Sequence, residues 1–145
     1  LIIVNLIILY YNNIKMKNII FEGIKYTYYL SLIALLFLYL FPGSIIGFFL
    51  YDDFGKQPNL VSNPFGASIN HLIFFFCLGI QSFITHIKYK KVIYGFPFLF
   101  CLSILFELSH LIIPNRAFEI NDLFANSIGV ISAFLILNLI KKLKN

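Results

Sequence analysis

The residues best suited to chemistry lie close together in one stretch, residues 106–129, which reads FELSHLIIPNRAFEINDLFANSIG. The chain is 60% hydrophobic and only 12% charged, so a stretch with this many ionisable groups stands out. It holds Glu107, His110, Arg116, Asp122 and Asn126, and a further histidine, His71, lies upstream. Carboxylates and histidines serve in proton transfer and metal ligation, and arginine binds anions.

Composition places these residues in a membrane protein. The chain has 145 residues, a mean hydropathy of +0.89 and 19% aromatic residues. Only helices and closed barrels satisfy their backbone hydrogen bonds in lipid, and no alternating strand pattern is present, so helices are expected. Residues 16–145 are predicted to form a single membrane domain that begins near Met16, with residues 1–15 as an upstream extension.

Four apolar stretches are long enough to be spans. They cover about residues 26–41, 69–87, 92–113 and 123–140. Pro42-Gly43, a polar loop at 51–66, the sequence KYKK and Pro114-Asn115 separate or end them. The fold class is therefore predicted as all-α, a bundle of four transmembrane helices. SIIGFFLY, after the first span, is expected at the membrane interface or as a ragged extension.

Basic residues indicate the orientation. Nine of the 11 fall at one end of the spans: Lys15, Lys17, Lys25, Lys88, Lys90, Lys91, Lys141, Lys142 and Lys144. Lys56 and Arg116 fall at the other end. Because cytoplasmic loops carry the excess of lysine and arginine, both termini are predicted to be cytoplasmic, in a multi-pass protein of the cell inner (cytoplasmic) membrane.

With that topology, the chemically suited residues all map to the outer end of the spans. Glu107 and His110 are three positions apart, and Asp122, Asn126 and Gly129 follow a spacing of four and then three. Each set shares one helix face. Because ionisable groups are costly at membrane depth, they are expected to face inward and pair. The predicted pairs are Glu107 with Arg116, and Asp122 with Arg116 or His71.

Simpler interpretations exist for several of these residues. Asp122 suits the N-cap of the fourth helix, and Arg116 suits an exposed loop where it meets lipid phosphate. Gly129 suits close helix packing, while Asn126 and His71 suit hydrogen bonds between helices.

Other chemistry finds less support. Glu107-x-x-His110 resembles half of a carboxylate-bridged two-metal site, which His71 and Asp122 could complete, but only one such motif is present. No metal and no cofactor are therefore predicted. The sequence also lacks a phosphate-binding glycine loop and a basic recognition helix, so no nucleic-acid partner is expected. Cys77 and Cys101 are expected as small core residues without a disulfide.

The spacing E-x8-R-x5-D-x3-N-x2-G, from Glu107 to Gly129, resembles the signature of the VanZ-like family of small bacterial membrane proteins. In that family an E-x-x-Q, an R and a D-x-x-x-N-x-x-G lie on the third and fourth helices. His71 matches the histidine of the second helix, and the likeness covers about residues 26–140. Ala67 and Ser68 stand where the family commonly has an Asp-Lys pair, and His110 replaces the glutamine.

The resemblance implies a role in the cell envelope, because the family takes its name from a protein associated with low-level teicoplanin resistance. One hypothesis is an outward polar pocket in which Arg116 binds an anionic group of a lipid, a cell-wall precursor or a glycopeptide. A second is an enzyme acting on an outer-leaflet lipid or precursor, with Glu107 or His71 as general base. A third is a structural subunit whose polar residues lock the helices together. The sequence does not indicate an oligomeric state.

Overall fold

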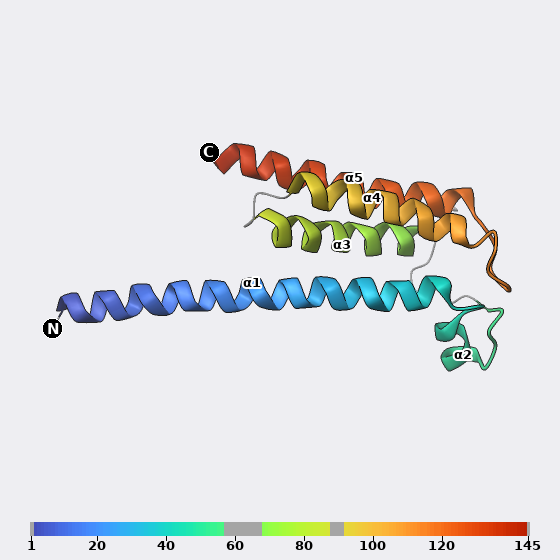
Figure 1. Ribbon diagram of the computed structural model, residues 1–145, viewed down its shortest axis with the longest axis horizontal. Helices are drawn as coiled ribbons and strands as arrows, with labels where there is room; N and C mark the ends of the chain where they lie inside the picture. The colour runs from blue at the N-terminus through green and yellow to red at the C-terminus, as the bar shows by residue number, and fades with distance from the viewer. Residues whose placement is uncertain (1, 57–67, 88–91, 145) are drawn as a thin grey trace.

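The computed structural model describes residues 2–56, 68–87 and 92–144, and every regular element in these ranges is a helix, as predicted. Figure 1 labels them as α1 (Ile2–Leu40), α2 (Ile45–Tyr51), α3 (Ile69–Ile87), α4 (Val92–Ser109) and α5 (Ile120–Lys144). The predicted KYKK stretch and most of the polar loop 51–66 lie outside the described residues.

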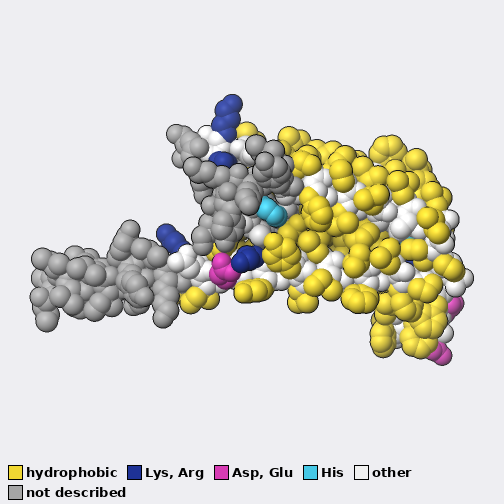
Figure 2. Space-filling model, viewed as in Figure 1, with side chains coloured by type: hydrophobic (Ala, Val, Ile, Leu, Met, Phe, Trp, Pro, Cys, Tyr) yellow, Lys and Arg dark blue, Asp and Glu magenta, His cyan; other side chains and the backbone are white. Residues whose placement is uncertain are grey.

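Within the described residues, three helical segments are long and apolar enough to cross a membrane: Met16–Leu40, Ile69–His86 and Ile120–Leu143. The apolar part of α4, Gly95–Ser109, is shorter. Large apolar side chains point outward from these helices, including Phe98 and Phe124, and Figure 2 shows them covering much of the visible face. A surface of this kind belongs in lipid, so the chain is a membrane protein. Cys77 and Cys101 are free as predicted, but they are exposed on this surface and not in the core.

The end of the first span was predicted well, but the segment after it is more regular than expected. α1 ends at Leu40, just before Pro42. Gly43 then turns the chain with φ +91°, and SIIGFFLY forms the separate helix α2. Ser44 caps α2, because its hydroxyl accepts a hydrogen bond from the backbone N–H of Gly47 at 2.9 Å.

The ends of α4 and α5 differ from the prediction in ways that matter for the polar residues. α4 ends at Ser109 and not at 113, because the His110 N–H bonds the Glu107 carbonyl at 3.1 Å in a tighter, three-residue turn. His110 therefore lies just beyond α4. α5 begins at Ile120, so Asp122 lies inside its first turn and is not its N-cap.

The long helices lie side by side, with α3 in contact with α1, α4 and α5. Both chain termini lie at one end of this arrangement, as Figure 1 shows. At the other end α1 and α4 finish while α3 and α5 begin. Buried apolar residues fill the interior between them, among them Leu35, Phe75, Leu99 and Val130. That shared end receives the polar side chains.

α3 and α5 approach each other closely at Gly129. A Cβ atom there would lie 2.5 Å from the carbonyl oxygen of Leu72 and 3.1 Å from the Cβ of Phe75. Gly79 repeats the contact from the opposite side, where a Cβ would lie 2.6 Å from that of Ala133. Small residues let membrane helices pack this tightly and gain dispersion energy.

The substitution Gly129→Ala is expected to destabilise the protein by about 1 to 3 kcal/mol, because the added methyl group meets backbone atoms of α3. Gly23→Ala is the matched control, since a Cβ at Gly23 has no heavy atom within 4 Å. The thermal unfolding midpoints of both variants in detergent would check this. Equal midpoints would contradict the tight α3–α5 contact.

Candidate functional site

The polar side chains converge where α1 and α4 end and α3 and α5 begin. We call this group the polar cluster; it consists of Tyr39, Ser68, His71, Glu107, His110, Asp122 and Asn126. Five of its members are buried: Glu107 and Asn126 are 0%, His110 5%, Asp122 7% and Tyr39 8% exposed. The His71 side chain keeps 24% of its surface accessible. The cluster is therefore an interior site with one partly open side.

Asp122 is held by two residues at the start of α3. Its Oδ2 lies 3.4 Å from His71 Nε2, and its Oδ1 accepts a hydrogen bond from the Ser68 hydroxyl. Of the two partners predicted for Asp122, the structure has His71. Ser68 stands where the family resemblance leads one to expect lysine, and its hydroxyl donates to this carboxylate.

The other nitrogen of His71 faces α1 and α5. Nδ1 lies 2.8 Å from the Tyr39 hydroxyl and 3.1 Å from Asn126 Oδ1, and the Tyr39 hydroxyl donates to that same Oδ1 at 3.3 Å. Because an amide oxygen only accepts, the contact with Asn126 assigns a proton to Nδ1. Nε2 is the ring nitrogen that faces Asp122.

Tyr39 also packs its ring into the cluster. It stacks on the His110 ring with centroids 5.2 Å apart, and on Phe106 with centroids 5.1 Å apart. The hydroxyl and the ring thus connect α1 with α3, with the end of α4 and with α5. No sequence pattern pointed to Tyr39, because it lies in an apolar span with several other tyrosines.

Glu107 is the most deeply buried acid in the part of the chain described. Its Oε1 accepts a hydrogen bond from the Glu119 backbone N–H at 3.2 Å and lies 3.3 Å from His110 Nδ1. Its Oε2 has no partner among the described residues, and neither have His110 Nε2 and Asn126 Nδ2. Each buried polar atom left without a hydrogen-bond partner destabilises the folded protein by about 1 to 3 kcal/mol, so these three atoms together lower its stability substantially.

The predicted ion pair between Glu107 and Arg116 is wrong. Arg116 instead donates from Nε to the Phe41 carbonyl at 3.3 Å and from Nη2 to the Leu38 carbonyl. The last carbonyls of a helix lack intrahelical donors, and a cation near them also complements the helix dipole. Partial burial lowers the pKa of Arg116, the neighbouring Tyr39 and Glu107 side chains oppose that shift, and the guanidinium stays charged.

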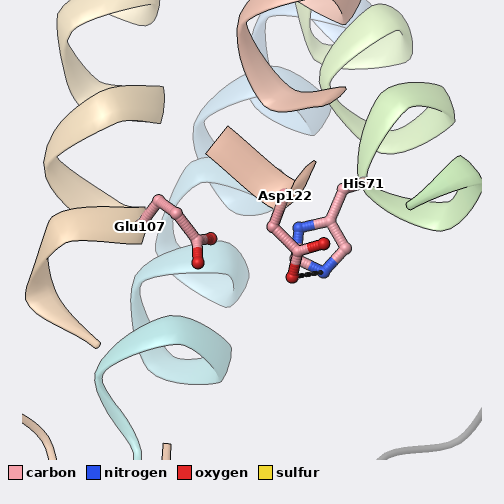
Figure 3. A group of neighbouring side chains, drawn as sticks. All are labelled: His71, Glu107 and Asp122. Atoms are coloured by element: carbon pink, nitrogen blue, oxygen red, sulfur yellow. Dashed lines mark ion pairs between the residues drawn. The ribbon is translucent and has the colours of Figure 1, made fainter. Parts of the chain in front are cut away.

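Figure 3 shows how three of the cluster residues face one another from three different helices. His71, Glu107 and Asp122 each offer one atom able to bind a metal, and these atoms all lie within 4.8 Å of one another. One imidazole and two carboxylates are also a suitable set for proton transfer. The sequence analysis named His71 and Asp122 as residues that could complete a site with Glu107, and the structure brings the three together.

Together the fold and the site define an all-helical membrane protein with a buried polar cluster at one end of its helices. The family model described as VanZ/LLP1 matches residues 2–141. The chain therefore belongs to the VanZ/LLP1 family, in agreement with the resemblance found in its motifs. No match was found among curated proteins or among solved structures.

Tyr39→Phe is expected to destabilise the protein by about 1 kcal/mol, because it removes the hydroxyl shared by His71 and Asn126 and keeps the ring stacking. Tyr29→Phe, at an exposed position of the same helix, should leave stability unchanged. Thermal unfolding of both variants in one detergent would test this. An unchanged midpoint for Tyr39→Phe would show that the hydroxyl does not contribute to the stability of the network.

Proposed function

We propose that this protein is a multi-pass protein of the cytoplasmic membrane in which α1, α3, α4 and α5 form a single bundle of four transmembrane helices. Both termini then face the cytoplasm, and the polar cluster faces the outside of the cell. The distribution of lysines supports this orientation, since nine of the 11 basic residues belong to the end that carries the termini.

We further propose that the polar cluster recognises an envelope molecule. The observation that supports this most is the set of buried atoms without partners: Glu107 Oε2, His110 Nε2 and Asn126 Nδ2. Buried polar groups in native proteins are nearly always satisfied, and exceptions call for an explanation. A ligand with both donors and acceptors supplies the missing hydrogen bonds, as a cell-wall precursor, a lipid head group or a glycopeptide does through its amide and hydroxyl groups.

Arg116 does not pair with Glu107, so in this proposal it lies at the rim of the site. Two of its nitrogens are used on the carbonyls of Leu38 and Phe41, and the third, Nη1, has no protein partner in the described part of the chain. Nη1 carries two N–H bonds, which suit contact with a phosphate or carboxylate at the rim of the site. Binding of teicoplanin or of its cell-wall target in this way connects the site to glycopeptide resistance.

Acid–base catalysis on an outer-leaflet lipid or precursor is the second candidate. It is favoured by the contact of His71 with Asp122, because a carboxylate beside an imidazole is a common arrangement for a general base. The Ser68 hydroxyl donates to Asp122 and not to His71, so the contact that would activate a serine nucleophile is not made. This places recognition ahead of catalysis.

Glu107→Gln is expected to abolish the contribution of the protein to teicoplanin tolerance, because it replaces an acceptor oxygen inside the cluster while keeping the side-chain shape. Glu119→Gln is the matched control: that side chain is exposed, and only its backbone N–H touches Glu107. The measurement is growth of a strain lacking the protein, complemented by each variant, with the membrane level of each variant checked by immunoblot.

Two results would count against recognition at this cluster. One is full complementation by Glu107→Gln at normal protein level. The other is loss of growth that simply follows loss of the protein from the membrane, which would favour a structural role. Binding of a purified lipid-linked cell-wall precursor, compared between wild type and the two variants, gives an independent measurement.

The proposed orientation has its own test. Green fluorescent protein fused after residue 145 is expected to fluoresce, because the C-terminus then lies in the cytoplasm. Alkaline phosphatase inserted after Gly55, beyond α2, is expected to be active, because it lies outside. A non-fluorescent C-terminal fusion together with an inactive phosphatase insertion would show that the orientation is the reverse of the one proposed.

A further inference from the structure

We propose that the polar cluster binds one divalent transition-metal ion, of which Zn²⁺ is the best match, through His71, Glu107 and Asp122. The inference does not depend on the proposed function, because metal binding is measured without any envelope ligand. The sequence alone argued against a metal, since it has only one Glu-x-x-His motif. The fold changes that conclusion by bringing together residues from three helices.

The spacing of the first two ligands supports chelation. His71 Nε2 and Asp122 Oδ2 are 3.4 Å apart. A charge-assisted N–H to O hydrogen bond is shorter, about 2.7 to 2.9 Å. Two ligands on a tetrahedral zinc ion, with bonds of about 2.0 to 2.1 Å, are separated by about 3.3 to 3.4 Å. The observed distance therefore suits an ion between the two atoms better than a shared proton.

The surroundings of His71 orient it as a metal ligand. Its Nδ1 is held by Asn126 and Tyr39, which leaves Nε2 facing Asp122. Histidines that bind metals nearly always donate their other ring N–H to a neighbouring acceptor, which fixes the tautomer and the ring orientation. Asn126 and Tyr39 supply that support here.

The charge of the site also calls for a cation. Glu107 and Asp122 are both buried, and their ion-pair partners among the described residues are histidines, His110 and His71, which carry a charge only when protonated. Arg116, the nearest candidate by sequence, is used at the end of α1. Buried carboxylates need a partner, and a divalent ion neutralises both of them at once.

Glu107 provides the independent sign of a ligand. The residue is 0% exposed, one carboxylate oxygen is fixed by Glu119 N–H, and the other has no partner. Its ligating oxygen lies within 4.8 Å of those of His71 and Asp122. Compared with the separation of about 3.4 Å between two ligands of one zinc ion, up to about 1.4 Å of approach remains, and rotation about the glutamate side-chain bonds covers it. Three protein ligands leave a fourth position open, as in zinc sites that take up water or a substrate oxygen.

The test uses the full chain purified in detergent, stripped of metal with a chelator and titrated with Zn²⁺ and separately with Mn²⁺. The background is Cys77→Ser with Cys101→Ser, since exposed thiols also bind zinc. We expect one Zn²⁺ per chain by calorimetry and by elemental analysis. Glu107→Gln and Asp122→Asn should each weaken binding at least about tenfold, the smallest loss seen even for supporting residues.

His86→Gln is the matched control, because His86 is on the same helix as His71 and contacts Ser82 and Gly95 away from the cluster. It should bind Zn²⁺ like the background protein. Circular dichroism and size-exclusion chromatography establish that each variant is folded, and His71→Gln replaces any carboxylate variant that is not. Folded background protein that binds neither metal, or equal affinity in every folded cluster variant, would overturn the proposal.

Discussion

The burial of the Glu107 carboxylate is the constraint on which the rest of the polar end depends. A charged group at membrane depth costs at least about 2.5 to 3.5 kcal/mol unless it is paired, so its neighbours must compensate for it. Here the compensation comes from His110, one residue beyond α4, and from the backbone N–H of Glu119 just before α5. The path of the chain between α4 and α5 is thereby tied to one carboxylate.

Close helix packing and the polar cluster are two aspects of a single arrangement. Gly129 lets α5 approach the backbone of α3, and one and two turns earlier the same face of α5 carries Asn126 and Asp122. These side chains then reach His71 at 3.1 Å and 3.4 Å. A wider separation of the two helices would break both contacts, so the small residue sets the geometry of the polar ones.

Much of this end of the molecule could be predicted from sequence, because helical periodicity alone places Asp122, Asn126 and Gly129 on one face. The contact of Asp122 with His71 also followed from topology, since both lie at the same end of their helices. The partners of Arg116 could not be predicted in this way, because spacing along the chain contains no information about which backbone carbonyls lie nearby in space.

Tyr39 and α2 escaped prediction for related reasons. A tyrosine in an apolar span looks the same whether its hydroxyl meets lipid head groups or a buried histidine. α2 depends on the Ser44 cap and the positive φ of Gly43, whose effect is set by the local backbone and not by hydropathy. In each case the prediction needs to know which residues meet in the folded structure. The pattern of apolar residues indicates only how long a helix is and how deep it lies in the membrane.

The loop at residues 110–119 is fixed by hydrogen bonds at two places. Arg116 donates to carbonyls at the end of α1, and the backbone N–H of Glu119 donates to the carboxylate of Glu107. The two contacts are only three residues apart, so a short piece of chain joins the buried carboxylate to the point where the first helix ends. The segment that leads from α1 into α2 is therefore positioned by the same loop that closes the polar cluster.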